Sequence, residues 1–145
     1  MSHYCSSGPK LRSRKGKVKG YFEFYTRSMP CLTKLYFIFY LNGVKIVPHN
    51  IYELLTPIAL AHLIMGDGSA QKSGLVLCTD SFTIYDVVKL MNVLLIKYQL
   101  DCTFRLHTPS HPRIYIRSHS MSKLKAIVYP YMHTKMMYKL DIHSK

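Results

Sequence analysis

The stretch that decides the fold is TPIALAHLIMGDGS, residues Thr56–Ser69. Thr56 is a preferred N-cap residue and Pro57 is favoured at the first helical position, so a helix is predicted to begin here. Its residues are apolar on nearly all sides, which predicts a helix buried all round. Gly68 is suited to the left-handed conformation that closes a helix. The pattern therefore predicts an apolar helix that ends at Gly66-Asp67-Gly68, with Asp67 on its last turn.

Asp67 occupies an electrostatically unfavourable place at the end of this helix. The C-terminal end of a helix carries partial negative charge, so a carboxylate there is mildly disfavoured. A bound cation would reverse that penalty. A lone carboxylate after a glycine is more often an ordinary helix-end group, so the position by itself leaves both interpretations open.

The flanking sequence switches between the periodicities of strands and helices. Upstream, we expect an aromatic-rich strand at 21–27, a helix that starts at Pro30 and stops at Asn42-Gly43, and a connector up to residue 50. Downstream, the predicted elements are strands at 69–73 and 74–80, a helix from near Ser81 to Leu95, strands at 101–107 and 113–117 joined by the loop 108–112, and a helix at 121–131. The order from Thr56 is helix, strand, strand, helix, strand, strand, helix.

The composition indicates a polyanionic partner. The 145 residues include 20 Lys and Arg against 7 Asp and Glu, a net charge of +13, which is typical of proteins that bind nucleic acid. Six basic residues between Lys10 and Lys19 form either a solvated tail or a phosphate-binding hairpin. Glycines and a proline interrupt any amphipathic helix in the first twenty residues, so no cleavable targeting signal is expected. The longest apolar run, Leu35–Leu41, is too short to span a bilayer.

The four cysteines are Cys5, Cys31, Cys78 and Cys102. They form no C-x-x-C pair and have no short spacing to histidine, which argues against a zinc ribbon or finger. An even number permits disulfides, but three of the four lie within apolar patterns, where cysteine is more often a small buried hydrophobe. Reduced thiols are therefore predicted.

The segment LAHLIMGDG at Leu60–Gly68 resembles the signature of LAGLIDADG homing endonucleases, in particular the organellar, intron-encoded group with two motif-bearing halves in one chain. Four further blocks occur in the order expected for that group: KIVPHNIYELLTP (45–57), LCTDSFT (77–83), RIYI (113–116) and PYMHTKMMYKL (130–140). The resemblance implies an α+β fold, αββαββα, with helices on one face of a saddle-shaped antiparallel sheet. It also implies that residues 51–145 form a complete domain and residues 1–50 a basic tail plus the remnant of a first half, because no second motif occurs.

The resemblance implies a catalytic site as well. Asp67 stands where the family's motif helices reach DNA, and with the Gly66 carbonyl it is expected to hold Mg²⁺ for phosphodiester hydrolysis. Lys45 and Lys139 match family positions whose lysines stabilise developing negative charge or order the attacking water. Taken alone, either lysine is most simply a solvated cation.

The two last strands carry the expected recognition surface. Alternation places Cys102, Phe104, Leu106, Ile114 and Ile116 on the core face. The opposite face is expected to bind DNA through Arg105, His107, Arg113, Tyr115 and Arg117, and to be extended by Ser69, Gln71 and Ser73. Arginines there can read guanine or grip phosphates, although the exposed face of any sheet is polar. His107 and His111 are interpreted as DNA-facing or exposed rather than as a metal pair.

Two functions from different classes remain open at this point. The first is a magnesium-dependent endonuclease that cuts both strands of DNA, and the second is a non-cleaving remnant or an intron RNA maturase. A homodimer through the Pro57–Met65 helix is predicted, because that helix lacks a partner motif; the competing possibility is that residues 1–43 fold over it. The family's setting implies a mitochondrial or chloroplast location. A basic globular domain without a site is the third, plainest interpretation.

Overall fold

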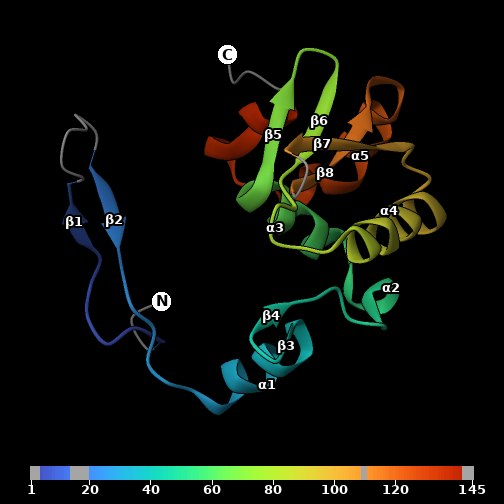
Figure 1. The fold of residues 1–145 in the computed structure, drawn as a ribbon. Coiled ribbons are helices and arrows are strands. Elements are labelled where there is room, and N and C mark those ends of the chain that lie inside the picture. The colour runs from blue at the N-terminus through green and yellow to red at the C-terminus, as the bar shows by residue number, and fades with distance from the viewer. Residues whose placement is uncertain (1–3, 14–19, 109–110, 142–145) are drawn as a thin grey trace. The chain divides into compact units, whose positions relative to one another are not determined.

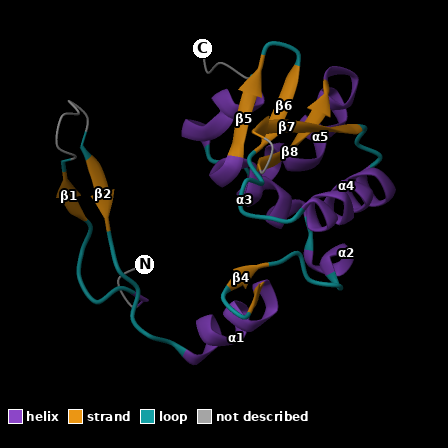
Figure 2. Cartoon of the chain, in the orientation of Figure 1, coloured by secondary structure: helices purple, strands orange, loops and turns teal. Residues whose placement is uncertain are grey.

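The computed structural model describes residues 4–13, 20–108 and 111–141, with the side chain of His107 left out (Figure 1). The chain divides into two compact units, residues 1–38 and 39–145, and each unit is described by itself. Figure 2 shows that the first unit contains little regular structure, whereas the second combines strands and helices.

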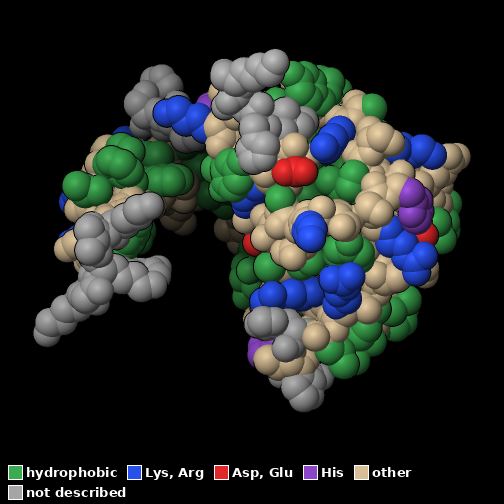
Figure 3. Space-filling model, turned by 90° about the horizontal axis from the view of Figure 1, so that it is seen from above, with side chains coloured by type: hydrophobic (Ala, Val, Ile, Leu, Met, Phe, Trp, Pro, Cys, Tyr) green, Lys and Arg blue, Asp and Glu red, His purple; other side chains and the backbone are tan. Residues whose placement is uncertain are grey.

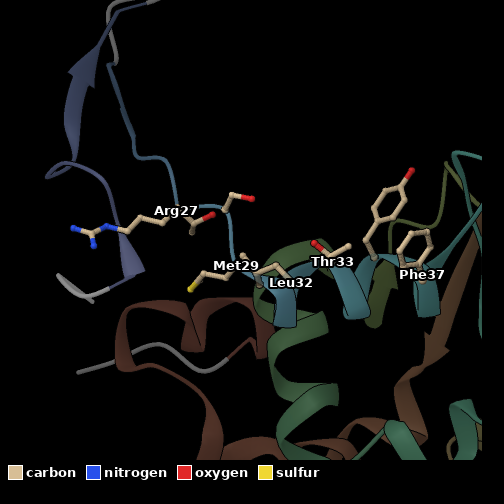
Figure 4. Close-up of a pocket in the computed structure, with 8 residues that line it drawn as sticks. Arg27, Met29, Leu32, Thr33 and Phe37 are labelled. Atoms are coloured by element: carbon tan, nitrogen blue, oxygen red, sulfur yellow. The ribbon is translucent and has the colours of Figure 1, made fainter.

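The first unit contains an antiparallel pair of strands, β1 (Lys10–Arg12) and β2 (Tyr21–Glu23), and most of helix α1 (Pro30–Phe39). The strand predicted at 21–27 is shorter than expected, although Thr26 still pairs with Cys5 in an isolated bridge. None of the ten residues of α1 is buried. An open groove runs beside this helix (Figure 4), and its lining residues are Thr26, Arg27, Ser28, Met29, Leu32, Thr33, Tyr36 and Phe37.

The second unit begins with a tight hairpin of β3 (Tyr40–Leu41) and β4 (Val44–Lys45). Asn42 and Gly43 both have positive φ, 50° and 77°, the conformation that a two-residue hairpin turn requires. The predicted stop at Asn42-Gly43 is therefore this turn, and α1 ends shortly before it at Phe39. A short helix that the sequence analysis did not predict, α2 (Ile51–Leu54), follows the predicted connector.

Helix α3 (Pro57–Asp67) begins at the predicted residue and ends within the predicted Gly66-Asp67-Gly68 segment. The Thr56 hydroxyl accepts a hydrogen bond from the Ala59 backbone N–H at 3.2 Å, which confirms the predicted N-cap. The expectation that α3 is buried all round is wrong. Only Leu60, Ala61 and Ile64 are buried, whereas Ile58 is 51% exposed, because the unit packs against one side of the helix only.

Gly68 corrects another expectation, since its φ of −76° and ψ of 145° are extended rather than left-handed. A Cβ at this position would lie 2.5 Å from the Ile64 carbonyl oxygen. The glycine is therefore needed for close packing where the chain passes from α3 directly into the first strand of the sheet.

A four-stranded antiparallel sheet in the order β5-β6-β8-β7 forms the centre of the second unit. Its strands are β5 (Gly68–Gln71), β6 (Gly74–Leu77), β7 (Cys102–Thr108) and β8 (His111–Arg117). All four residues of β6 are buried rather than alternating, because β6 is a central strand between β5 and β8. The hairpin β7–β8 extends further than predicted, to Thr108 and His111, and carries a register shift between Leu106 and Thr108.

Two further helices complete the unit: α4 (Ile84–Tyr98), capped by Thr83, and α5 (Met121–Val128). Short 3₁₀ helices follow at Tyr129–Tyr131 and Thr134–Leu140. The largest fully buried side chains come from these helices, α3, the sheet and the loop before β7: Leu60, Ile64, Leu75, Leu77, Val87, Leu94, Leu100, Ile114, Ile116, Leu124, Val128 and Leu140. From Thr56 onward, the element order α, β, β, α, β, β, α confirms the predicted α+β fold.

The residues predicted to form the core face of the β7–β8 hairpin do so except at the tip of the hairpin. Ile114 and Ile116 are fully buried, and Cys102 and Phe104 pack against the core, whereas Leu106 is 56% exposed. Leu106 pairs with Pro112, beyond the point where β6 stops pairing with β8 at Ile114. The end of the hairpin therefore projects past the sheet, and Leu106 has no core to cover it.

The four cysteines are free thiols, as predicted. Burial raises the pKa of Cys102 to about 12, so this thiol stays protonated and packs as a small apolar side chain. In the part of the chain that the structure describes, no helix has both the length and the apolar character needed to cross a membrane.

Candidate active site and nucleic-acid interface

The C-terminal end of α3 presents the carboxylate that the sequence singles out. Asp67 is the last residue of the helix and is exposed, and its backbone carbonyl accepts a hydrogen bond from the Cys78 N–H at 2.9 Å. This bond ties the end of α3 to the residue that follows β6. The backbone of Asp67 is thus held at the boundary between the helix and the sheet.

Lys139 reaches the same end of α3 from the last 3₁₀ helix. Its Nζ donates to the carbonyl oxygens of Met65 at 2.6 Å and Gly66 at 3.2 Å. These carbonyls belong to the last turn of α3, where such groups lack partners within the helix and carry negative partial charge. The buried Leu140 anchors the segment that carries Lys139. The structure therefore gathers Asp67, Gly66 and Lys139, three of the predicted site residues, in one place.

Lys45 has a different environment. It lies half-buried on β4, and its Nζ is 4.6 Å from the centroid of the Phe82 ring, a cation–π arrangement. Lys45 and Phe82 also line an apolar groove to which α3 contributes Ala59 and Leu63. Lys45 therefore approaches the side of α3, whereas Lys139 holds its end.

The donors at the end of α3 suit half of a magnesium site. Mg²⁺ is commonly held by one or two carboxylates, with water and phosphate oxygens filling the remaining positions. Asp67 provides one carboxylate, and the Gly66 carbonyl keeps a second lone pair beside its bond from Lys139. A Cβ added at Gly66 would meet no atom within 4 Å, so there is open space here. Among the described residues, no group of three or more His, Cys, Asp or Glu is placed to hold a metal ion.

Several of the predicted recognition residues lie next to one another on the sheet, and two of them form a stacked pair. The Arg105 guanidinium lies 3.5 Å from the centroid of the Tyr115 ring, and the Tyr115 hydroxyl donates to the Ser73 carbonyl at 3.0 Å. Ser69 and Gln71 are exposed on β5. Arg105, Tyr115 and Ser73 therefore form a connected surface across the β7–β8 hairpin and the β5–β6 turn.

Two arginines of this ribbon have acidic partners that lie outside the two strands. Arg113 makes two hydrogen bonds of 2.7 Å to the Asp80 carboxylate, and its hydrogen bond to Asp80 raises the pKa of Arg113. Arg117 pairs with Asp101 at 3.1 Å, and His119 lies 3.2 Å from the same carboxylate. Two of the three arginines thus carry carboxylate partners, and Arg105 stacks on a ring instead.

The sequence contains a usable signal for these missed partners. Asp80 follows the central strand β6, and Asp101 immediately precedes β7, so both acids lie next to strands that flank β8. The Thr79 hydroxyl strengthens the first of these contacts by donating to the Pro112 carbonyl at 2.6 Å.

The remaining predicted residues have local roles or are outside the description. His111 is half-buried and its Nδ1 is hydrogen-bonded to the Thr108 hydroxyl. The side chain of His107 lies outside the described residues. The face shown in Figure 3 carries several Lys and Arg side chains next to one another with few acidic ones, as the net charge of +13 leads one to expect.

Comparison with known families and proteins gives a consistent result. Residues 1–124 match the profile of the LAGLIDADG DNA endonuclease family. The chain is 34% identical over 142 residues to the cytochrome b mRNA maturase bI2 of Debaryomyces hansenii, a match that covers 94% of this chain and 54% of that protein. It is 37% identical over 123 residues to the intron-encoded endonuclease ai4 of Dictyostelium discoideum, covering 83% of this chain and 77% of the relative. The chain therefore spans about half the length of the Debaryomyces relative.

A solved structure resembles the whole chain. The homing endonuclease I-WcaI, bound to its DNA recognition sequence, superimposes with a TM-score of 0.86 at 28% sequence identity. The match covers 99% of this chain and 68% of the endonuclease chain.

Proposed function

The chain belongs to the LAGLIDADG DNA endonuclease family, and on that premise we propose that it is a site-specific homing endonuclease that hydrolyses both strands of a long DNA target with Mg²⁺. The observation that carries this proposal is the meeting of Asp67, Gly66 and Lys139 at the end of α3. A related homing endonuclease was solved bound to its DNA recognition sequence, which supports double-stranded DNA as the partner.

The residues at the end of α3 have different proposed roles in hydrolysis. When bound, Mg²⁺ supplies a water of lowered pKa and neutralises charge on the scissile phosphate. The Asp67 carboxylate and the Gly66 carbonyl hold the ion at the helix end, where its charge offsets the negative end of the helix dipole. Lys139, already placed by the Met65 and Gly66 carbonyls, provides a cation beside the phosphate where negative charge develops. Lys45 is proposed to serve the same purpose from β4.

A second carboxylate is needed to complete the metal site, because α3 supplies only Asp67. We propose that residues 51–145 form one complete LAGLIDADG domain and that residues 1–50 correspond to a basic tail and the end of a first half. A second copy of the chain, docked through the Pro57–Met65 helix, would supply the other Asp67. In that arrangement the target is pseudo-palindromic, since a two-fold protein matches a two-fold site.

The cleavage test uses a plasmid library that carries randomised pseudo-palindromic inserts. The full chain is expected to linearise a subset of plasmids in Mg²⁺ and none in EDTA, and sequencing of the cut ends identifies the target. Retention of library plasmids by the protein without any cutting in Mg²⁺ would favour the non-cleaving alternative and overturn the proposed reaction.

The DNA-binding surface is proposed to run over the exposed face of the sheet. Its residues are Ser69, Gln71, Ser73, Arg105, His107, Arg113, Tyr115 and Arg117. Arg105 is the strongest candidate for a phosphate or base contact, because it stacks on the Tyr115 ring, whereas Arg113 and Arg117 are paired with the carboxylates of Asp80 and Asp101.

Replacing Arg105 with Ala is expected to weaken DNA binding and to reduce the slope of log K against log salt concentration by about one unit. Lys123→Met is the matched control, since Lys123 is an exposed cation on α5 that donates to Gln99 rather than lying on the sheet. Binding measured by fluorescence anisotropy at several salt concentrations gives both slopes. Equal slopes for wild type and Arg105→Ala would place the interface elsewhere, for example on Lys10–Lys19.

An RNA maturase role is the second candidate, and the names of the relatives favour it. The Debaryomyces protein and a Saccharomyces cerevisiae relative, 32% identical over 149 residues, are both cytochrome b mRNA maturases. The same names support a mitochondrial setting for this chain and give no support to a chloroplast. A splicing assay with a group of organellar intron transcripts, run beside the cleavage assay, separates the two functions.

A further inference from the structure

Two side chains of helix α4 form hydrogen bonds with the backbone of Val47, one with its N–H group and the other with its carbonyl. The Val47 N–H donates to Asp86 Oδ1 at 3.2 Å, and the Val47 carbonyl accepts from Lys89 Nζ at 2.9 Å. Both side chains come from the first two turns of α4, and Val47 is about forty residues away in sequence. The oppositely charged side chains of Asp86 and Lys89 therefore hold the segment that follows β4, a contact called the grip below.

The carboxylate in this grip is buried. Asp86 is only 5% exposed; its Oδ2 accepts from the Thr83 hydroxyl at 2.9 Å, and its Oδ1 lies 3.7 Å from Lys89 Nζ. A buried charge is costly unless it is paired and hydrogen-bonded, and here both oxygens are engaged. The capping bond at the start of α4, from the Asp86 N–H, is accepted by the Thr83 hydroxyl and not by this carboxylate. Its additional bond is the one to Val47.

The grip lies two residues from Lys45. On its other side, Lys45 pairs with Tyr40 across the β3–β4 hairpin, and the Ile46 N–H donates to the Phe39 carbonyl at 2.8 Å. The Lys45 ammonium in turn lies over the ring of Phe82, which directly precedes the cap residue of α4. The start of α4 therefore contacts both the backbone after Lys45 and its side chain.

We propose that Asp86 and Lys89 form a clamp, here called the Val47 clamp, that positions Lys45 for the cleavage reaction. The proposal rests on the proposed endonuclease function of Lys45. A lysine that stabilises charge on a phosphate must be placed within a fraction of an ångström, and a displacement of about 1 Å can cost up to about 100-fold in rate. Asp86 and Lys89 touch no reacting atom in this arrangement, so they are positioning residues.

The first test follows the Lys45 side chain by NMR in the full chain without DNA. Its ε-methylene protons lie near the face of the Phe82 ring and are expected to be shifted upfield by the ring current; Lys45→Met identifies the signal. Asp86→Ala and Lys89→Met are expected to move this signal toward the position of an exposed lysine. Asp86→Asn, which keeps an acceptor for the Val47 N–H but removes the charge opposite Lys89, is expected to move it less.

Lys97→Met is the matched control. Lys97 also extends from α4, donates to a backbone carbonyl, that of Tyr52, and lies 5.0 Å from the centroid of an aromatic ring. It holds α2 rather than the segment after β4, so its loss is expected to leave the Lys45 signal in place. An unchanged Lys45 signal in folded Asp86→Ala and Lys89→Met would overturn the clamp.

The second test uses the cleavage rate. Asp86→Ala is expected to lower the single-turnover rate by about 10- to 100-fold while DNA affinity stays within about two-fold. In a Lys45→Met background the same substitution should have no further effect, because coupled residues are not additive. Losses that multiply in the double variant would show that Asp86 acts on overall stability instead. If Asp86→Ala and Lys89→Met show the NMR shift but the wild-type chain never cuts DNA, the endonuclease function is contradicted, whereas the control of Lys45 by Asp86 and Lys89 stands.

Discussion

Asp67→Asn is expected to abolish magnesium-dependent cleavage, with a fall of about 10³-fold or more in rate, the upper range for removal of one preorganised electrostatic group. The amide keeps the size of the side chain but is a poor ligand for a hard cation. DNA affinity is expected to stay within about two-fold, because one exposed side chain among many phosphate contacts is changed. Single-turnover cleavage and anisotropy titrations on the same preparation measure both quantities.

Asp141→Asn provides the matched control. Asp141 is an exposed aspartate two residues after Lys139, and its φ of 56° is a conformation that Asn tolerates. The substitution removes the same charge close to the same site and leaves the sequence of α3 unchanged, so cleavage is expected to persist. If Asp67→Asn cuts DNA as fast as the wild type, Asp67 has no part in the reaction.

The sequence predicted the elements whose signals are local. Thr56 and Pro57 define the start of α3, and the Thr56 hydroxyl makes the expected capping bond. Asn42-Gly43 was predicted to stop the preceding helix, and the pair forms a tight turn because few other residue pairs tolerate positive φ at both positions. Propensity and hydrogen-bonding capacity within a few residues decide such features, so they can be read before the fold is known.

Features that depend on distant neighbours were not predictable in this way. Gly68 is extended because the Ile64 carbonyl lies against it, a contact set by how α3 enters the sheet. Arg113 appears free on its strand, but Asp80, 33 residues earlier, pairs with it once β6 and β8 are adjacent. The grip on Val47 by Asp86 is likewise invisible until α4 packs beside β4.

The chain is expected to form a homodimer in which the α3 helices of the two copies pack side by side and run parallel. The two Asp67 residues can meet only if both helix ends point toward the DNA, which places the two-fold axis along the helices and each residue opposite its own copy. The face available for this contact is the exposed side of α3, where Ile58, His62 and Gly66 follow one another at intervals of four residues. Ile58 is apolar and Gly66 is small, and both allow close approach of a second helix at their positions.

Ile58→Glu is the change that tests this arrangement. It places two carboxylates near each other across the axis and removes apolar contact, so the dimer dissociation constant is expected to rise at least about 100-fold. The fold of each chain should survive, because Ile58 is 51% exposed and a glutamate in the first turn of a helix is favoured by the dipole. Ile96→Glu is the matched control, since Ile96 is 69% exposed on α4, away from the proposed contact.

Sedimentation velocity at micromolar concentration, with and without DNA, measures the outcome directly. The wild type and Ile96→Glu should sediment as dimers and cut both strands, whereas Ile58→Glu should sediment as a monomer that lacks double-strand cleavage. A wild-type chain that stays monomeric under both conditions would contradict the dimer. Because each chain has a single Asp67 at the end of α3, that result would require the second carboxylate to come from another polypeptide segment, or would leave a protein that binds nucleic acid without cutting it.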